Sequence, residues 1–101
     1  MPKKGLELGQ VVVTRNAWAE ITANTGGDKE AIVALAGMLD KYRDYEWGDL
    51  DPEDRLANDR AVKLGGRTLG SYSTGLVTNG KIWIITEADR SVTTVLLPED
   101  Y

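Results

Sequence analysis

Two runs of branched and aromatic apolar residues near the C-terminal end dominate the hydrophobic pattern of the chain. They span residues 82–86 and 92–97, and the short polar segment 87–91 separates them. Such side chains suit a pleated, half-buried surface, so the pattern predicts two strands joined as a hairpin. Asn79 and Gly80 add a turn before the first run, because both residue types tolerate the positive φ of tight turns. We expect the core to form on this hairpin.

The rest of the pattern predicts three helices between two further strands. The valine-rich run 10–14 and the alternating run 67–74 are the expected strands. Apolar residues at helical spacing predict helices over residues 15–24, 29–42 and 51–64. The resulting order, β-α-α-α-β-β-β, is an α+β fold in which the helices pack on one face of a small antiparallel sheet.

Individual residues set the expected ends and inward faces of the helices. Asp28 and Asp51 are good N-caps, since a carboxylate accepts hydrogen bonds from the free amides of the first turn. Gly37 costs about 1 kcal/mol relative to alanine inside a helix, so a closely packed neighbour is expected there. The residues expected to face the core are Ile32, Leu35, Met38, Leu39 and Tyr42 in the second helix and Leu56, Ala57, Ala61 and Leu64 in the third.

Length and composition narrow the classes of function. The 101 residues are expected to form one domain, residues 1–101, with residues 1–8 as a loose lead-in. The absence of cysteine excludes disulfides and thiolate chemistry, and the absence of histidine removes the usual general base and the commonest metal ligand. No apolar run approaches the ~20 residues that span a bilayer, and no secretory signal is evident. We therefore expect a soluble cytoplasmic protein.

Residues 75–81 come close to the sequence of a phosphate-binding loop. Gly75 and Gly80 have the required spacing and Lys81 follows, but Ile82 stands where a serine or threonine should hold magnesium. A strand is expected after the loop, instead of the helix whose N-terminus would hold a phosphate. A hairpin turn is the favoured interpretation, and nucleotide binding through this loop is the alternative.

Four acids at 49–54 have spacing similar to that of a calcium loop. That motif needs a glycine at its sixth position and a glutamate at its twelfth, where this chain has Asp54 and Arg60. A capped helix start explains the same acids, so no metal site is predicted.

The sequence also singles out no catalytic residue. Ser71, Ser73 and Thr74 offer hydroxyl groups, but no histidine is present to activate them. Activation by lysine requires a desolvated lysine beside the hydroxyl, and the sequence identifies none. The carboxylates of Glu87 and Asp89 lack a third group that would tune them for acid–base catalysis. No cofactor is predicted.

The excess negative charge lies in one segment. Residues 40–60 hold eight acidic and four basic side chains, a difference that equals the net charge of -4 of the whole chain. Aromatic residues anchor interfaces while charge steers encounter, so this segment is a candidate for binding a basic partner. A solvated helix pair with inward aromatics is the competing interpretation. The residues predicted for the contact are Trp47, Asp49, Asp51, Glu53 and Asp54, and a second candidate surface at the hairpin tip consists of Glu87, Asp89 and Arg90.

Several segments carry a resemblance to known proteins: LGQVV at 8–12, WGD at 47–49, NDRA at 58–61, GR at 66–67, SY at 71–72, WIITEADRSVTT at 83–94, Leu97-Pro98 and Tyr101. They resemble a family of short bacterial proteins carried on plasmids and other mobile elements. The resemblance covers nearly the whole chain, is most specific in the C-terminal third, and is weakest over residues 23–41. Some members carry the label of a type I restriction methylation subunit. This chain is too short for that role and lacks both the glycine-rich cofactor loop and the Asn-Pro-Pro-aromatic or Asp-Pro-Pro-aromatic motif.

These observations together favour a non-enzymatic, acidic protein-binding module from a mobile element. We expect it to inhibit or modulate a host nucleic-acid-handling defence complex, of the restriction or CRISPR type, by placing its acids in a basic groove meant for DNA. Neither direct nucleic-acid binding nor a membrane partner is expected. Two alternatives stay open: a small nucleotide-binding protein or enzyme that uses the 75–81 loop, and a homo-oligomeric structural protein formed by pairing of an exposed sheet edge.

Overall fold

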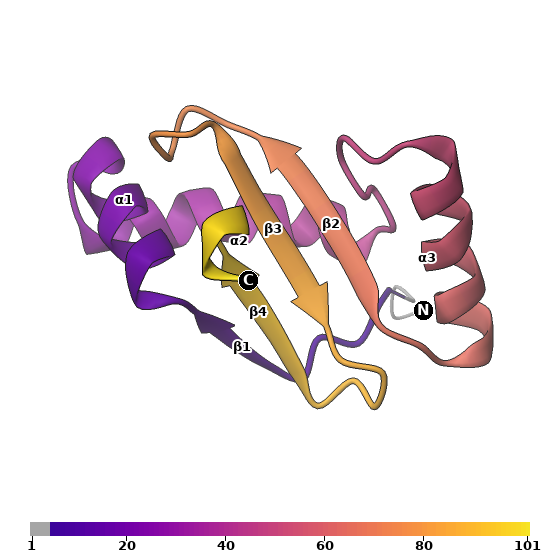
Figure 1. The fold of residues 1–101 in the computed structure, drawn as a ribbon. Coiled ribbons are helices and arrows are strands. Elements are labelled where there is room, and N and C mark those ends of the chain that lie inside the picture. The colour runs from indigo at the N-terminus through magenta and orange to yellow at the C-terminus, as the bar shows by residue number, and fades with distance from the viewer. Residues whose placement is uncertain (1–4) are drawn as a thin grey trace.

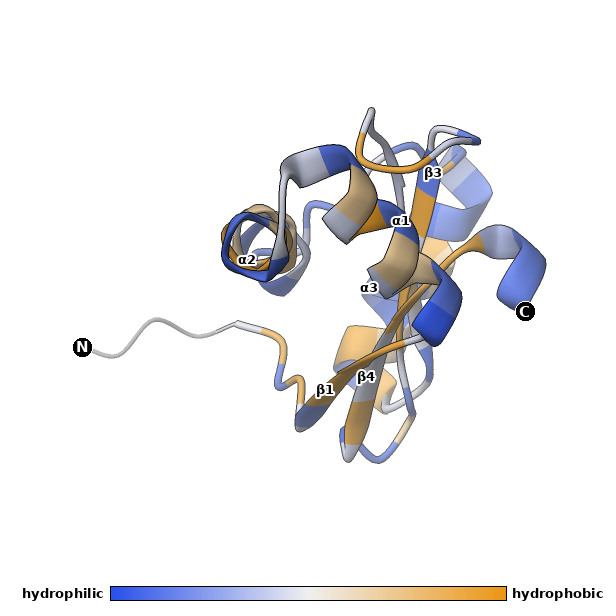
Figure 2. Ribbon diagram, turned by 90° about the vertical axis from the view of Figure 1, so that its left-hand side faces the viewer, coloured by the Kyte–Doolittle hydropathy of each residue, from blue (hydrophilic) through white to orange (hydrophobic). Residues whose placement is uncertain are grey.

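The computed structural model describes residues 5–101, and within them a four-stranded sheet carries three α-helices (Figure 1). The elements are β1 (Gln10–Val13), α1 (Arg15–Thr25), α2 (Asp28–Arg43), α3 (Pro52–Leu64), β2 (Thr68–Ser73), β3 (Lys81–Thr86), β4 (Val92–Leu96) and the 3-10 helix η1 (Pro98–Asp100). The strands lie in the order β1-β4-β3-β2. α1 and α2 cover one face of the sheet, η1 lies on the other face, and α3 lies beside the β2 edge (Figure 1, Figure 2).

The α+β class and the element order β-α-α-α-β-β-β are confirmed, but the sheet is mixed. β2, β3 and β4 pair antiparallel, whereas β1 pairs parallel to β4, with Gln10 beside Val92 and Val13 beside Val95. The prediction of an antiparallel sheet is therefore wrong for β1. Three helices and two strands separate β1 from β4 along the chain, so no tight turn fixes the direction in which these two strands pair.

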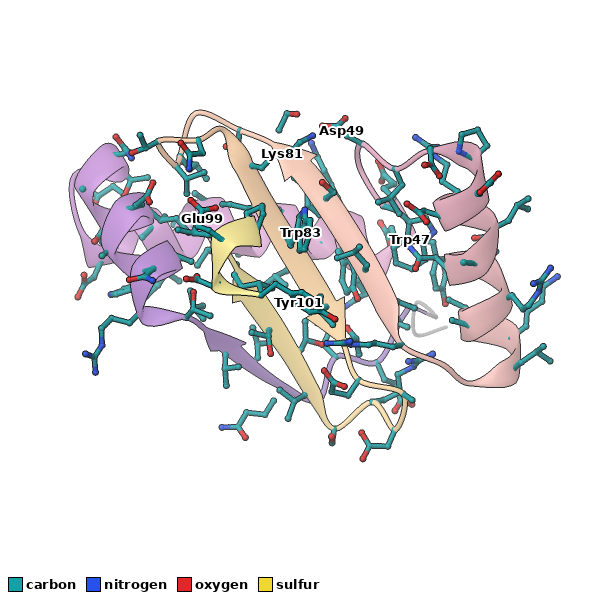
Figure 3. The ribbon with its side chains drawn as sticks, viewed as in Figure 1. Trp47, Asp49, Lys81, Trp83, Glu99 and Tyr101 are labelled. Carbon is teal, nitrogen blue, oxygen red and sulfur yellow. The ribbon has the colours of Figure 1, made fainter. Side chains whose placement is uncertain are left out.

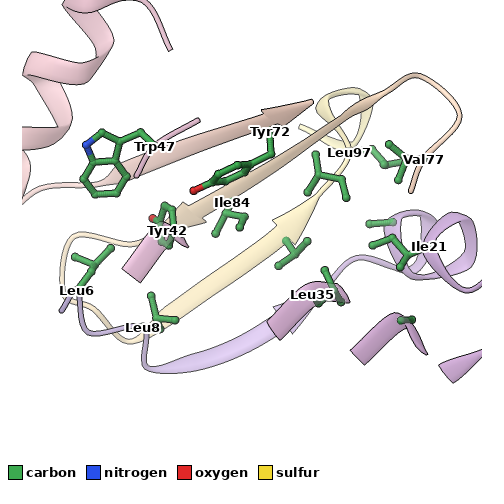
Figure 4. Close-up of a cluster of buried hydrophobic side chains, with 14 residues drawn as sticks. Leu6, Leu8, Ile21, Leu35, Tyr42, Trp47, Tyr72, Val77, Ile84 and Leu97 are labelled. Atoms are coloured by element: carbon green, nitrogen blue, oxygen red, sulfur yellow. The ribbon is translucent and has the colours of Figure 1, made fainter. Parts of the chain in front are cut away.

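The β3–β4 hairpin forms the centre of the sheet and of the core, as predicted. Alternation along the strands directs Ile82, Ile84 and Val95 to the face that α1 and α2 cover, and all three are fully buried. Ile21 of α1 and Leu35 of α2 belong to the same buried cluster (Figure 4). Each such side chain contributes about 1.5–3 kcal/mol by burial, so this layer is the main source of stability.

A chain of buried hydroxyl groups joins α2 to three strand segments. The Tyr42 hydroxyl lies 2.5 Å from Thr68 Oγ1 and 2.7 Å from Thr86 Oγ1, and Thr86 Oγ1 lies 2.8 Å from Thr93 Oγ1. Thr93 donates to the Leu8 carbonyl at 2.7 Å. Each hydroxyl has one proton, so donation runs in one direction along the chain, from Thr68 to the carbonyl. Burial raises the pKa of the Tyr42 hydroxyl.

The N-terminal segment belongs to the core from Leu6 onward. Leu6 and Leu8 are buried, and the Leu6 N–H donates to the Arg43 carbonyl at 3.0 Å. The loose lead-in predicted for residues 1–8 is therefore wrong for these two leucines, while residues 1–4 lie outside the described part of the chain. Two leucines flanking one polar residue form too short an alternation to indicate burial by themselves.

α2 buries a narrower face than its apolar pattern predicted. Ala31, Leu35 and Tyr42 are its buried residues, whereas Ile32 is exposed. The apolar stripe is wider than the surface that α1 and the sheet cover, so its margin lies in solvent. The close neighbour expected at Gly37 is also missing from the described residues, because nothing lies within 4 Å of the position of a Cβ there.

Candidate functional site

The outer edge of β2 is closed by the loop that precedes α3. Ser71 donates its N–H to the Trp47 carbonyl at 2.9 Å and accepts from the Asp49 N–H at 2.6 Å, which adds a one-residue parallel bridge to the sheet. Gly48 lies between them with φ of 81°, and a Cβ at this residue would stand 2.0 Å from the Ser71 carbonyl oxygen. Only glycine fits this approach, so the loop is fixed to the sheet.

α3 attaches to the same edge through Asn58. Its side-chain amide donates to the Leu69 carbonyl at 2.6 Å and accepts from the Leu69 N–H at 3.1 Å. Asn58 is the buried residue of α3, whereas Leu56 and Leu64, which were predicted to face inward, are 62% and 78% exposed. That predicted face is wrong because a strand edge offers unpaired backbone polar groups, which an amide satisfies and a leucine does not. Most of the surface of α3 is consequently exposed.

Asp49 links the loop to the end of β2 and the start of β3 (Figure 3). Its Oδ2 accepts from the Ser73 hydroxyl, from the Ser73 N–H at 3.1 Å and from Lys81 Nζ at 3.2 Å. The Ser73 hydroxyl first, and Lys81 second, hold the pKa of Asp49 below its ordinary 3.8. Lys81 Nζ also lies 3.2 Å from Ser73 Oγ, a pair that the sequence did not single out. The Lys81 side chain is 41% exposed, so it lacks the desolvation that lysine activation of a serine requires.

The first turn of α3 presents the remaining acids of the predicted contact. The Asp51 carboxylate accepts from the Asp54 N–H at 2.9 Å, which confirms it as the N-cap. The side chains of Glu53 and Asp54 are exposed, and their negative charges interact favourably with the positive, N-terminal end of the helix dipole. Asp51, Glu53 and Asp54 thus lie at the N-terminal end of α3, and Asp49 lies in the loop that leads into it.

Trp47 is buried, so its predicted role as a surface anchor is wrong. It packs edge-on against Tyr42 with ring centroids 5.4 Å apart, and its Nε1 donates to the Asp59 carboxylate at 3.4 Å. Tyr45 is the aromatic residue at the surface, 40% exposed, with its ring edge-on to Trp47 at 5.9 Å. Its backbone φ of 68° turns the chain at this point, a conformation that side-chain patterns do not indicate.

The exposed acids of the loop and of the first turn of α3 are close neighbours in the chain. They lie in a stretch, residues 44–54, that contains no basic residue. Of these acids, Glu46 and Asp49 line a hollow of about 480 Å³, together with Tyr45 and the basic residues Lys41 and Arg55, among others. Arg55 belongs to the scaffold of the loop, because its guanidinium donates to the Gly48 carbonyl at 3.1 Å. The acidic surface, as we call it, comprises Tyr45, Glu46, Asp49, Asp51, Glu53 and Asp54.

The hairpin tip, the second predicted surface, is docked against the C-terminal end of α3. Arg90 has φ of 62°, and its guanidinium donates to the carbonyls of Gly66 at 2.5 Å and Ala61 at 3.1 Å. Carbonyls at a helix C-terminus are free to accept such bonds. Arg90 is therefore occupied inside the protein and is not available to anchor a partner, contrary to the prediction.

The two carboxylates of the tip contact other groups of the protein itself. Asp89 accepts from the Ser91 hydroxyl at 2.6 Å and the Ser91 N–H at 3.0 Å, and the hydroxyl is the main cause that lowers the pKa of Asp89. Glu87 lies 3.6 Å from the Arg67 guanidinium, with both side chains about half exposed. Their roles as contact residues stay predictions, separate from the acidic surface.

The 75–81 loop forms the turn between β2 and β3, as the hairpin interpretation predicted. The Thr74 N–H donates to the Gly80 carbonyl at 2.9 Å, and Gly80 has φ of 75°. The Thr78 N–H donates to the Glu20 carboxylate at 2.6 Å. An amide of this loop is thus already bound to an anion, and a strand follows, so the arrangement disfavours phosphate.

No protein-family model, curated protein or solved structure matches the chain. The resemblance to the plasmid-borne family therefore stays an expectation. Among residues 5–101, every helix is too short or too polar to cross a bilayer. Within the same residues, no three or more acidic side chains come together in a way that would hold a metal ion.

Proposed function

We propose that the protein is a non-enzymatic binding module whose acidic surface contacts a basic surface of a protein partner. The observation that carries this proposal is a set of exposed carboxylates, crowded into nine residues at the edge of the sheet. Like charges repel, and the described contacts that offset this repulsion are the Asp51 cap, the bonds of Asp49 with Ser73 and Lys81, and the dipole of α3 at Glu53 and Asp54. These carboxylates belong to Glu46, Asp49, Asp51, Glu53 and Asp54.

The acidic surface is ordered before any partner arrives. The bridge between Gly48 and Ser71 fixes the loop, and the Asp51 cap fixes the first turn of α3. Ordering a flexible segment on binding would cost affinity, and a pre-formed loop avoids that cost. Tyr45 adds an exposed ring over which an arginine of the partner can stack.

The partner class follows from the sign of the charge. A surface that attracts the phosphates of a nucleic acid is basic, and a row of carboxylates produces a field of the same sign as a phosphate backbone. An acidic module of this kind would occupy the nucleic-acid groove of its partner. Together with the resemblance to mobile-element proteins, this supports a role as an inhibitor or modulator of a host defence complex, of the restriction or CRISPR type.

Matched charge reversals test this function. Glu53→Lys/Asp54→Lys reverses two acids of the acidic surface and leaves the Asp51 cap intact, and Glu7→Lys/Glu30→Lys reverses two exposed acids elsewhere. Affinity capture from a bacterial extract, followed by binding assays with the purified partner, compares the two variants with the unchanged protein.

We expect both the unchanged protein and the Glu7/Glu30 variant to capture a nucleic-acid-binding protein from the extract. The Glu53/Asp54 variant should bind it at least about tenfold more weakly, and added DNA or RNA should compete. Equal binding by both variants, or no specific partner, would count against the proposed function.

A further inference from the structure

A second exposed surface, on α2, has the residue pattern of an interface. α2 lies at the outside of the helical layer (Figure 2), and its buried residues, Ala31, Leu35 and Tyr42, leave the opposite side of the helix exposed. Two of its branched apolar residues, Ile32 and Val33, are 59% and 69% exposed. Residues three and four apart share one face of a helix, which here gives a continuous exposed stripe. The stripe consists of Lys29, Ile32, Val33, Ala36, Gly37 and Asp40, all of them exposed.

The monomer gives no reason for the glycine in this stripe. Gly37 lies inside a helix, where it costs about 1 kcal/mol relative to alanine. A Cβ at this position would meet nothing within 4 Å, so no neighbour within the described chain requires glycine. A residue without a side chain does permit close approach of a second backbone. Gly37 therefore points to a partner outside the monomer.

We propose that α2 packs antiparallel against α2 of a second copy of this chain, about a twofold axis that passes between residues 34 and 35. With this axis, Ile32 lies beside Ala36 of the second copy and Val33 lies beside Gly37 of the second copy. Each large side chain thus meets a small residue, which lets the two helices interdigitate at short separation. The symmetry repeats every contact twice, as in any isologous dimer.

Charge complementarity selects a second copy in this orientation. Lys29 stands at the N-terminal end of the stripe and Asp40 at its C-terminal end, and the same axis brings Lys29 level with Asp40 of the second copy. A parallel pair would place each charge against its own kind. The first turn of α2 otherwise holds acids and its last turn holds bases, which favours the antiparallel pair further.

The size of the contact sets the expected strength. A single helix from each copy buries less than the roughly 1,600 Å² of a standard stable interface. We therefore expect a reversible dimer with a dissociation constant on the order of 10–100 µM.

Sedimentation of the full chain over a concentration series that brackets this constant tests the proposal. Lys29→Glu and Asp40→Lys should each weaken the dimer about tenfold, because each replaces two attractive pairs with repulsive ones. The charge swap Lys29→Glu/Asp40→Lys should restore association to within about threefold, since it rebuilds both pairs. Lys63→Glu on α3 is the matched control and should leave association unchanged.

Gly37→Leu provides a second, uncharged test. The open space around Gly37 tolerates the side chain in the monomer, but leucine would collide with Val33 of the second copy, so the dimer should be lost. A chain that stays monomeric throughout would overturn the proposal. So would a dimer that the swap does not rescue or that Gly37→Leu leaves intact.

Discussion

The side-chain amide of Asn58 pairs with both backbone groups of Leu69, so a helix residue completes the hydrogen bonding of an edge strand. The bridge between Gly48 and Ser71 continues this closure along β2. An open strand edge invites pairing with another chain, and β2 therefore does not offer one. If copies associated through a sheet edge, β1, with its exposed Val11 and Val12, would be the edge involved.

Replacing Asn58 tests how α3 is held. Asn58→Ala removes two hydrogen bonds and leaves the N–H and carbonyl of Leu69 without partners in a partly buried place, so the free energy of unfolding should fall by about 2–3 kcal/mol. Urea denaturation measures this loss, and hydrogen exchange should show faster exchange of the Leu69 amide. Asn79→Ala, which removes an exposed contact with Glu99, is the control. Equal losses in both variants would contradict the role of Asn58.

The buried hydroxyl chain gives a second prediction. Tyr42→Phe keeps the ring but leaves the hydroxyls of Thr68 and Thr86 with one partner fewer inside the core. We expect a loss of about 1–3 kcal/mol in the free energy of unfolding. Tyr45→Phe at the surface should change it by less than about 0.5 kcal/mol. Urea unfolding of the two variants measures this difference. A Tyr42→Phe variant with the same free energy of unfolding as the unchanged protein would contradict the network.

The pKa of Asp49 gives a prediction for pH dependence. Ser73 and Lys81 favour its charged form, so its pKa is lower in the folded than in the unfolded protein. The stability that follows is fully present above the unfolded pKa, near 3.8, and is lost as pH falls through the folded pKa. An NMR titration of the side-chain carboxyl carbon should give a midpoint below 3.8, and Ser73→Ala should raise it. A midpoint at or above the ordinary value would contradict the contact.

Replacement by alanine should change the stability of the protein in opposite directions at two glycines. Gly48→Ala forces a side chain into the Ser71 carbonyl at positive φ and should cost about 2 kcal/mol or more. Gly37→Ala fills open space in a helix and should stabilise the monomer by up to about 1 kcal/mol. Thermal unfolding at a protein concentration below the expected dimer constant should show a shift of about 4–8 °C for each kcal/mol. Shifts of the same sign would contradict this account.

The sequence predicted correctly those elements that depend on residues close together in the chain. The β3–β4 hairpin follows from branched runs around a polar turn, and Asp51 caps α3 as its position before Pro52 indicated. The cap expected at Asp28 differs slightly, because α2 begins with Asp28 itself after Gly27, with no side-chain cap.

Features set by contacts between distant segments could not be predicted in this way. The parallel pairing of β1 depends on where the chain returns after three helices and two strands. The burial of Trp47, which donates to Asp59 of α3, and the docking of Arg90 on Ala61 of α3 both depend on where α3 lies in the fold. The exposure of the acids at residues 49–54 could be predicted because charged side chains seldom lie in a core. Which of Tyr45 and Trp47 is exposed could not, because that depends on tertiary contacts.

The most direct test of the acidic surface is a titration of isotope-labelled protein with an arginine-rich peptide, followed by NMR. The peptide stands in for a basic groove and requires no knowledge of the natural partner. The account predicts that amide shifts concentrate in residues 45–54 and fade as salt screens the contact. Shifts that spread evenly over all exposed acids, including Glu7 and Glu30, or that gather at another surface, would contradict it.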